Sequence, residues 1–348
     1  MAHTVLKGVP PKNDSVFPEG RPNVKKLLVA MALAAARPAH ALTINVISAP
    51  DTNATAATKL TDAVLAPDSG INVTNSTFVG DIATSSTNPN SGQSGTYTGF
   101  SLVSNSGGPT LNLPNGIVLT SGSANIPFSN TNSSWEGHFP SSPGTDQDTE
   151  VEALLAAANA PSSVTNDVNS LVIEFTVDAG ITSVSANFVF GSDEFPDQGV
   201  TDFFMFIVDG VNYAKFPDGS LVSFVVGQNA ANFLNNGNGS PGQYPLEFDG
   251  ISLSLGVVGI LDPSLTTHTL KIVTGDTSDT VWDSGVFIGG LKAGTSTGSG
   301  GICGGPGQPA CPDNGGGDGG NGEVPEPGIL ALLGLVGLGL GLSRRRKA

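Results

Sequence analysis

An alternation of apolar and polar side chains with a period of two residues is the feature that most constrains the fold of this chain. In residues 171–177 and again in 184–190, apolar side chains occupy every second position. Successive side chains of a strand point to opposite faces of a sheet, so both runs predict strands with one buried face. Similar short runs, separated by Gly, Asp and Asn, predict further strands at 71–79, 116–120, 203–208, 221–226, 251–255, 269–274 and 281–288.

Residues 42–292 are therefore predicted to form a single all-β domain, either a β-sandwich or a jelly-roll-like fold. The reason is that many short strands occur without long helices between them. Two stretches, 54–65 and 150–160, predict short helices, and the second begins with Thr149 and Glu152 in the spacing of a capping box. No repeat of fixed period is present, which argues against a solenoid or a propeller.

The N-terminal residues 1–41 are predicted to be absent from the mature fold. A basic start, an apolar run at 27–36 and the small residues Ala39 and Ala41 are typical of a secretory signal peptide cleaved after Ala41. The apolar run has about 10 residues, too few to span a bilayer of about 30 Å. Residues 1–20 show no signal-like pattern, which leaves the true translation start open.

The C-terminal residues 324–348 combine Pro325, Glu326 and Pro327 with an apolar run at 328–342 and a basic end. The basic cluster predicts that the tail lies on the cytoplasmic side and the body outside the inner membrane. As a helix the run would measure about 22 Å, short for permanent spanning, so we expect the inner membrane to hold it only before processing.

This order of motif, apolar helix and basic end resembles the PEP-CTERM sorting signal. The resemblance implies a Gram-negative bacterium with an extracellular polysaccharide system. It also implies an exosortase, a membrane enzyme that cuts at the motif, as a processing partner. The expected location is the cell envelope, the cell surface or the extracellular matrix.

Residues 293–323 are dominated by Gly, Ser, Thr, Asn and Pro, which predicts a disordered linker between the body and the sorting helix. The two cysteines of the chain, Cys303 and Cys311, lie within this stretch, separated by seven residues of sequence GGPGQPA. In an oxidising compartment an even pair this close predicts a disulfide.

The charge distribution excludes a nucleic-acid partner bound through a basic face. Between residues 42 and 343 the chain has four lysines and no arginine against 28 acidic residues, a net charge of −24. Such a segment is repelled by nucleic acid and by anionic lipid. The excess acid serves either solubility or the attraction of divalent cations.

The body also resembles a known family, on the segments LTDAVLAPDSGINVTNSTFVGD, GIVLTSG, SANFVFGSDEFPDQGVTDFFMFIVDGV and HTLKIVTGDTSDTVWDSGVFIGG. They are similar to the successive motifs of the choice-of-anchor L domain and span most of residues 55–290. The strongest parts are FVFGSDEFPD and DSGVFI. The resemblance implies a bacterial surface domain and supplies neither a reaction nor a ligand. One departure is Phe195, where the family pattern leads us to expect Tyr.

Two groups of acidic residues are candidate metal ligands. The first surrounds the turn after residue 190, and the second precedes the strand that ends near residue 288. Oxygen ligands in turns at strand ends suit Ca²⁺, and carboxylates gathered there repel one another unless a cation binds. The alternative is a pair of solvated turns, because Asp favours turns for its own hydrogen bonding, and neither group has EF-hand spacing. The candidates are Asp193, Glu194, Asp197 and Asp202, and then Asp276, Asp279 and Asp283.

The sequence favours a secreted, non-catalytic protein with an adhesive or structural role, in association with extracellular polysaccharide and with calcium as a possible cofactor. The alternative is a secreted hydrolase, similar to a glycosidase, that uses the acidic turns as acid and base. After signal removal only His138 and His268 remain, so histidine-based catalysis has little material. A further acidic run at 146–152 is expected to stabilise the start of a helix.

Overall fold

The computed structural model describes residues 41–130, 147–199, 202–216, 218–237, 242–296, 298–305 and 308–311. The predicted signal peptide, including Ala39 of its cleavage site, lies outside these ranges except for its last residue, Ala41. So do the motif Pro325-Glu326-Pro327 and the predicted sorting helix. No helix within the described ranges is long and apolar enough to cross a membrane.

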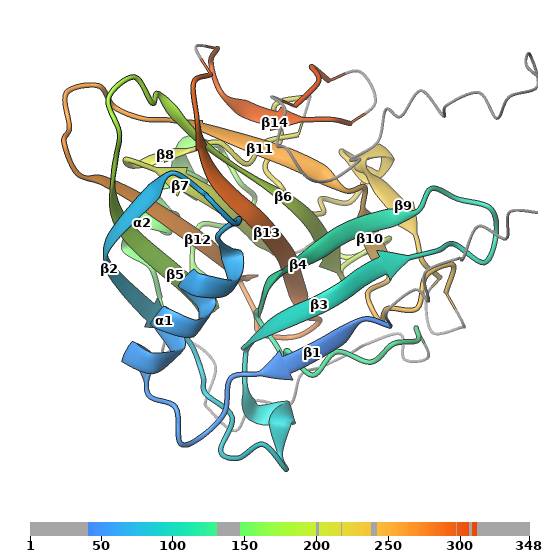
Figure 1. Cartoon of the computed structure of the whole chain (residues 1–348). Coiled ribbons are helices and arrows are strands. Elements are labelled where there is room, and N and C mark those ends of the chain that lie inside the picture. Colours follow the sequence, from blue (N-terminus) through green and yellow to red (C-terminus); the bar gives the residue numbers. More distant parts are fainter. Residues whose placement is uncertain are drawn as a thin grey trace, which may run out of the picture. The chain divides into compact units, whose positions relative to one another are not determined.

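Two antiparallel sheets form the body, so the prediction of an all-β fold with two short helices is confirmed (Figure 1). Sheet 1 has the order β1-β3-β4-β13-β6-β10-β9, with β11 paired to β6 and β14 paired to β11. Its strands are β1 (Thr43–Val46), β3 (Ser94–Leu102), β4 (Leu111–Thr120), β6 (Ser183–Ser192), β9 (Phe233–Asn235), β10 (Gly250–Ser252), β11 (Leu255–Ile260), β13 (Ser284–Gly294) and β14 (Gly301–Cys303).

Sheet 2 has the order β2-β5-β12-β7-β8. Its strands are β2 (Ile71–Val79), β5 (Thr165–Val177), β12 (His268–Thr277), β7 (Phe203–Val208) and β8 (Val211–Asn212). Two short 3₁₀ turns, Pro89–Ser91 and Ala230–Asn232, complete the elements together with helices α1 (Asn53–Val64) and α2 (Thr149–Ala157).

The strand β7 shows how the two faces of sheet 2 are buried. Phe204, Phe206 and Val208 point into the main core, where the ring of Phe204 lies 5.0 Å from that of Phe188 in sheet 1. The alternate residues of β7 point the other way and pack against Val151 and Leu155 of α2. Because both faces are covered, the run FFMFIV is apolar throughout instead of alternating.

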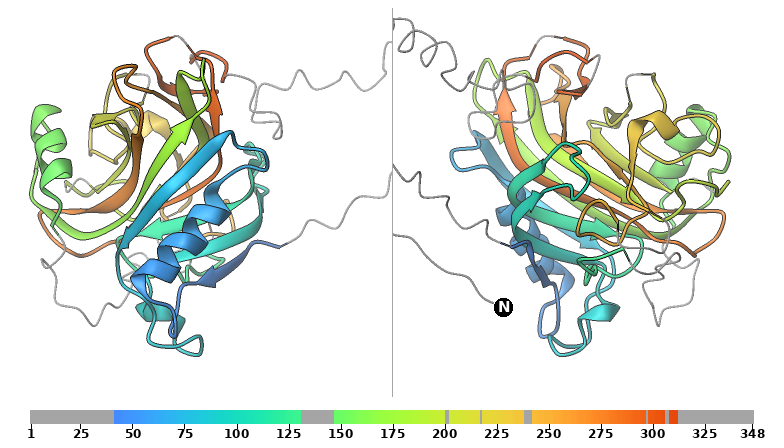
Figure 2. Two further views of the ribbon diagram at one scale, coloured as in Figure 1. Left: turned by 60° about the vertical axis from the view of Figure 1, so that its left-hand side comes forward. Right: turned by 90° about the vertical axis from the view of Figure 1, so that its right-hand side faces the viewer.

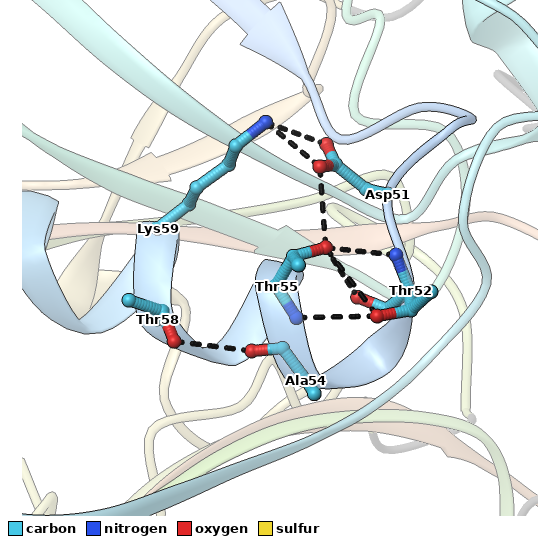
Figure 3. Close-up of polar contacts among 6 residues, drawn as sticks. All are labelled: Asp51, Thr52, Ala54, Thr55, Thr58 and Lys59. Atoms are coloured by element: carbon cyan, nitrogen blue, oxygen red, sulfur yellow. Dashed lines mark hydrogen bonds and ion pairs between the residues drawn. The ribbon is translucent and has the colours of Figure 1, made fainter.

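Helix α1 begins at a capping box that the sequence did not predict (Figure 3). The Thr52 hydroxyl accepts a hydrogen bond from the Thr55 N–H (3.4 Å), and the Thr55 hydroxyl accepts one from the Thr52 N–H (2.8 Å). The Asp51 carboxylate forms a salt bridge with Lys59, which lies one turn after Thr55 in the helix (Nζ to Oδ1, 2.8 Å). The apolar face of α1 packs into the main core, and Figure 2 shows α1 and α2 on different sides of sheet 2.

Helix α2 begins one residue earlier than predicted, and its cap differs. Asp148, not Thr149, is the N-cap residue, and its carboxylate accepts the N–H groups of Glu150 (3.1 Å) and Val151 (3.2 Å). The predicted capping box is therefore wrong, because the carboxylate before Thr149 satisfies the free N–H groups instead. The acidic run does stabilise a helix start, as expected.

Three other predictions differ from the structure. The strand predicted at 251–255 is divided between β10 and β11, and residues 253 and 254 belong to neither. Residues 221–226 form no strand, and Leu221 and Val222 make only isolated bridges. The reason is that Phe224 packs against Phe233 in a cluster of aromatic rings. The folded body also continues past residue 292, since β13 extends to Gly294 and β14 pairs with β11 inside the stretch predicted as a linker. Ile302, the apolar side chain in the middle of β14, is buried against the main core.

Candidate functional site

Acidic residues gather where three neighbouring strands of sheet 1 reach one end of the sheet. The register pairs the last residue of β6 with the first residues of β13 and β10, so Asp193, Asp283 and Asp249 each lie one residue beyond this row. The Asp193 N–H donates to the Asp283 carbonyl (3.1 Å), and the Asp249 N–H donates to Asp193 Oδ1 (3.1 Å). We call these three residues the sheet-1 acids.

A second row of acids lies at an end of sheet 2. The register pairs the first residue of β7 with Gly275 of β12, so Asp202 and Asp276 each lie one residue beyond that pair. Ser284, the first residue of β13, donates a hydrogen bond from its hydroxyl to Asp202 Oδ2 (2.8 Å), which joins this row to sheet 1. Glu194 follows Asp193 and acts electrostatically on Asp202. We call Glu194, Asp202 and Asp276 the sheet-2 acids.

The predicted acidic groups, distant in sequence, thus form one cluster in space. Five of the seven predicted residues are almost fully buried, whereas Asp197 and Asp279 are exposed at its rim. The exposed fractions of the buried five are 0% for Asp202 and Asp276, 1% for Glu194, 2% for Asp193 and 4% for Asp283. Such values decide against solvated turns, because a solvated carboxylate would be largely exposed.

Several carboxylate oxygens of the cluster have no partner among the described residues. Both oxygens of Glu194 and both of Asp276 lack a hydrogen bond of normal geometry, as do Asp193 Oδ2 and Asp202 Oδ1. Burying an ionised carboxylate without a hydrogen bond or a counter-charge is expensive. These oxygens therefore demand either protons or a cation.

The raised pKa values of the cluster also indicate that its carboxylates need protons or a cation. Burial raises the pKa of Asp202 and Asp276 well above the usual value, and Glu194 raises that of Asp202 further, as Asp202 does that of Asp276. Burial, followed by the charges of Asp279 and Asp197, raises the pKa of Glu194 to about 8. Without a cation, the cluster cannot be fully ionised at neutral pH.

The pKa of a sheet-1 acid is raised in the same way. Burial raises the pKa of Asp193 well above its usual value, and the charges of Asp249 and Asp283 raise it further. Asn130 orients Asp249, because its Nδ2 donates to Asp249 Oδ1 (2.7 Å).

Asp249 is the residue of the cluster that the sequence reasoning missed. It shares one signal with Asp202 and Asp283, because each of the three directly precedes the first residue of a strand. Asp249 has only Glu247 near it in the sequence, so it does not belong to an acidic run of the kind that indicated the other candidates.

Gly122 forms part of the wall around the cluster. It follows β4, and a Cβ atom built on it would lie 1.6 Å from Asp283 Oδ2. The Asp283 carboxylate therefore rests directly on the backbone of Gly122. Any larger residue at position 122 would collide with it.

Phe195 fixes the turn that carries Asp193 and Glu194. Its ring packs at 5.1 Å from Phe224 and 6.1 Å from Phe233, and it also lies against Gly250 at the start of β10. No tyrosine hydroxyl is needed for this packing, since Phe195 is held by other aromatic rings.

The chemistry of this cluster is that of hard oxygen ligands. Within the described ranges, no group of three or more His, Cys, Asp or Glu side chains is placed so that it could hold a metal ion. His268 lies at the far end of β12 from Asp276, about 27 Å away at 3.4 Å per residue. There its Nδ1 bonds to Asp209 Oδ2 (2.8 Å). His138 lies outside the described residues.

Cys303 and Cys311 form a disulfide with a Cα–Cα distance of 4.9 Å. Cys303 is the last residue of β14, and the disulfide packs against Gly256 of β11. A Cβ atom built on Gly256 would lie 2.3 Å from Cys311 Sγ. The disulfide is thus part of the folded body.

Two family models match the chain. The model of the choice-of-anchor L domain matches residues 47–292, and the model of the PEP-CTERM protein-sorting motif matches residues 323–347. No curated protein and no solved structure gives a match.

Proposed function

Because the chain belongs to the choice-of-anchor L family, we propose that its body acts outside the cell as a non-catalytic structural or adhesive domain stabilised by calcium. The PEP-CTERM motif marks the protein as exported to the envelope or surface of a Gram-negative bacterium and implies processing by an exosortase. The structural or adhesive role of the body at that location, and its stabilisation by calcium, are the parts that we propose.

One observation carries the calcium part of this proposal, namely the buried carboxylates of Glu194 and Asp276, whose four oxygens accept no hydrogen bond of normal geometry from the described residues. A cation bound between these acids would supply the missing counter-charge. Calcium fits better than zinc, which prefers His and Cys, and better than magnesium, which keeps several waters and demands near-ideal octahedral geometry. Extracellular calcium sites function at dissociation constants as weak as about 10⁻⁴–10⁻³ M.

The same burial speaks against the hydrolase alternative. A glycosidase needs two carboxyl groups that flank a bound sugar in an open cleft. The six acids of the cluster are at most 4% exposed, so no polysaccharide chain reaches them. Trp135, one of the two tryptophans that could form a sugar platform, lies outside the described residues.

An adhesive role toward extracellular polysaccharide has weaker support, from one surface. Strand β2 lies at the edge of sheet 2 and exposes Asn72, Thr74, Asn75 and Thr77 to solvent. Such short polar side chains offer donors and acceptors to sugar hydroxyls. We propose this edge as the contact with polysaccharide.

The test of the calcium part is thermal unfolding of the mature protein with a chelator, with magnesium and with calcium. A calcium concentration a hundredfold above the dissociation constant should stabilise the fold by about 2.7 kcal/mol. For a domain of this size that raises Tm by about 5–10 °C. Asp276→Asn should remove the shift, and the exposed control Asp178→Asn should keep it. Equal shifts with magnesium, or no shift at all, would contradict a calcium site.

The adhesive part is tested by co-sedimentation of the mature protein with extracellular polysaccharide purified from the producing bacterium. Binding that is lost in Asn75→Ala and unaffected by Asp178→Asn supports the proposal. Release of reducing sugars by the wild type but not by Asp276→Asn would instead establish the hydrolase.

A further inference from the structure

We propose that the loop between β12 and β13, residues 278–283, is a sugar-binding surface on which a sugar ring stacks against Trp282. The ligand class is a neutral polysaccharide whose rings have flat faces of C–H groups, such as a β-1,4-linked glucose polymer. This inference rests on the proposed adhesive function and adds a second surface to the edge of β2.

The Trp282 side chain takes no part in the packing that holds the fold together. It belongs to none of the three hydrophobic cores that the described residues form, and it is only partly buried. Its indole N–H donates no hydrogen bond to a described residue. Tryptophan is on average a highly buried residue, and its N–H usually has a partner when it is buried. A packing role therefore does not explain this side chain, and both its ring and its N–H are available to a ligand.

The backbone of Trp282 is fixed in a conformation that bulky residues rarely adopt. Its φ of 70° lies in the left-handed region, where the Cβ atom is crowded, and such a conformation persists only where the surroundings impose it. Here the Ser278 N–H donates to the Val164 carbonyl (3.2 Å), and the Asn166 side chain donates to the Asp279 carbonyl (3.0 Å). The loop is thus ordered before a ligand arrives, which lowers the entropy cost of binding.

Two exposed valines add apolar surface near Trp282. Val281 directly precedes it and is 41% exposed, and Val164, which the Ser278 N–H brings to the same loop, is 52% exposed. Three apolar side chains are few for a stable protein interface, which buries about 800 Å² on each partner. An indole ring, by contrast, is large enough to cover the face of a sugar ring.

Two exposed carboxylates supply hydrogen-bond acceptors beside the loop. Asp279 belongs to the loop itself and Asp197 to the loop between β6 and β7, and both act electrostatically on Glu194, so the two loops lie close together. A carboxylate accepts hydrogen bonds from sugar hydroxyls, and the Trp282 N–H donates to another hydroxyl. The same acids, in a segment with a net charge of −24, repel an acidic polysaccharide. Charge therefore favours a neutral ligand.

The flat indole ring also selects among neutral sugars. In a β-1,4-linked glucose polymer every ring substituent is equatorial, so each face of the sugar presents only C–H groups. Such a face packs on an aromatic ring through dispersion and through the attraction between C–H groups and the negative face of the ring. An axial hydroxyl would separate the two surfaces on that face.

The experiment is a calorimetric titration of the mature protein with cellohexaose, a neutral β-1,4-linked glucose oligomer, and with the matched oligomer of β-1,4-linked glucuronate. We expect cellohexaose to bind and the acidic oligomer to bind at least tenfold more weakly. Trp282→Ala should weaken cellohexaose binding at least tenfold, as expected for loss of the central aromatic contact. Val211→Ala is the matched control, because Val211 is 51% exposed but lies on β8.

Tryptophan fluorescence provides a second readout. In a Trp135→Phe background Trp282 is the remaining tryptophan, and cellohexaose should shift its emission to shorter wavelength because a sugar ring displaces water from the indole. Asp279→Asn should weaken binding severalfold by removing a charged acceptor. Asparagine keeps an oxygen that accepts the Val281 N–H, as Asp279 Oδ1 does (3.2 Å), so this variant remains informative where Trp282→Ala fails to fold. Circular dichroism verifies the fold of each variant.

The sugar-binding surface would be overturned if cellohexaose does not bind, or if folded Trp282→Ala binds it as tightly as the wild type does. Co-sedimentation with the extracellular polysaccharide distinguishes that result from failure of the proposed function. Co-sedimentation that is lost in Asn75→Ala but unchanged in Trp282→Ala would leave the edge of β2 as the contact and refute the Trp282 surface. Absence of co-sedimentation by the wild type would refute the adhesive function as well.

Discussion

At Gly122 the absence of a side chain decides where the Asp283 carboxylate can lie. A Cβ at this position would lie only 1.6 Å from Asp283 Oδ2, and Asp283 has no room to adjust because it is short, buried and followed at once by β13. The segment GIVLTSG is therefore tied to the segment DSGVFI by a steric requirement, although some 160 residues separate Gly122 from Asp283.

We expect Gly122→Ala to lower the stability of the calcium-loaded protein by about 1–3 kcal/mol, the range for overpacking a buried site. The calcium affinity should fall as well, because Asp283 is displaced. Thermal unfolding and calorimetric titration measure the two effects. Gly199→Ala is the matched control, since a Cβ there meets nothing within 4 Å. An unchanged calcium affinity in Gly122→Ala would show that Asp283 is not a ligand.

Glu194 gives the metal-free protein an unusual dependence on pH. Its pKa in the fold is about 8, against an ordinary value of 4.5. A carboxyl group with a raised pKa holds more protons in the folded state than in the unfolded state, so stability falls as pH rises between those two values. The penalty is absent below the ordinary pKa and complete above the raised one. Asp193, Asp202 and Asp276 add to it in the same direction.

We therefore expect the Tm of the chelator-treated protein to fall between about pH 5 and about pH 8. Saturating calcium should remove or reverse this slope, because a cation favours the ionised carboxylates. Calorimetric scans at several pH values, with and without calcium, measure the effect, and Glu194→Gln should flatten the metal-free slope. A metal-free Tm that rises over this interval would contradict an uncompensated acidic cluster.

At the level of single residues, the sequence allowed prediction of the acids that stand close together and not of those that meet only in space. The turn after β6 shows four acids within ten residues, so Asp193 and Glu194 were evident. Asp249 stands two residues from Glu247 and far from every other acid of the cluster in sequence. Only the pairing of β10 with β6 brings it beside Asp193.

The strands were predictable where one face is buried and the other is not, as in β5 and β6. Prediction failed where the contacts that form an element come from elsewhere in the chain. Residues 221–226 have a strand-like composition, yet aromatic packing overrides it. Strand β14 has only three residues in a Gly-rich stretch, and its partner β11 together with the disulfide holds it in place.

The disulfide makes β14 a part of the sheet. The cysteines stand eight residues apart, and closing a loop of that size restricts the unfolded chain by about 2–3 kcal/mol. We expect the double variant Cys303→Ser, Cys311→Ser to have a Tm lower by about 5–10 °C. The N–H groups of β14 should also exchange faster with deuterium than those of β13.

Hydrogen exchange followed by mass spectrometry checks this, with reduced wild-type protein as the control for the serine side chains. Unchanged exchange at β14 would show that the pairing with β11 and the burial of Ile302 suffice without the disulfide.

The molecule as a whole carries its negative charge in two environments. Outside the cluster, nearly all acidic residues of the described ranges are at least partly exposed, so water and salt screen them. The acids of the cluster are buried at the ends of both sheets, where salt ions do not reach. The first group favours solubility of an exported protein, whereas under the proposed function the second would make the stability of the fold depend on a bound cation.

The dependence of Tm on NaCl concentration distinguishes the effect of the exposed acids from that of the buried cluster. The Debye length falls from about 10 Å at 0.1 M to about 3 Å at 1 M ionic strength, so added NaCl should raise the Tm of the metal-free protein by screening its surface repulsion. The further increase caused by calcium should persist at about 1 M NaCl, because a buried ion pair is screened little. Thermal unfolding in a grid of NaCl and calcium concentrations measures both terms, with Asp276→Asn expected to respond to NaCl alone. A calcium effect that disappears at high salt would mean that calcium acts as a diffuse counter-ion at the surface, and the buried cluster would then remain protonated in the folded protein.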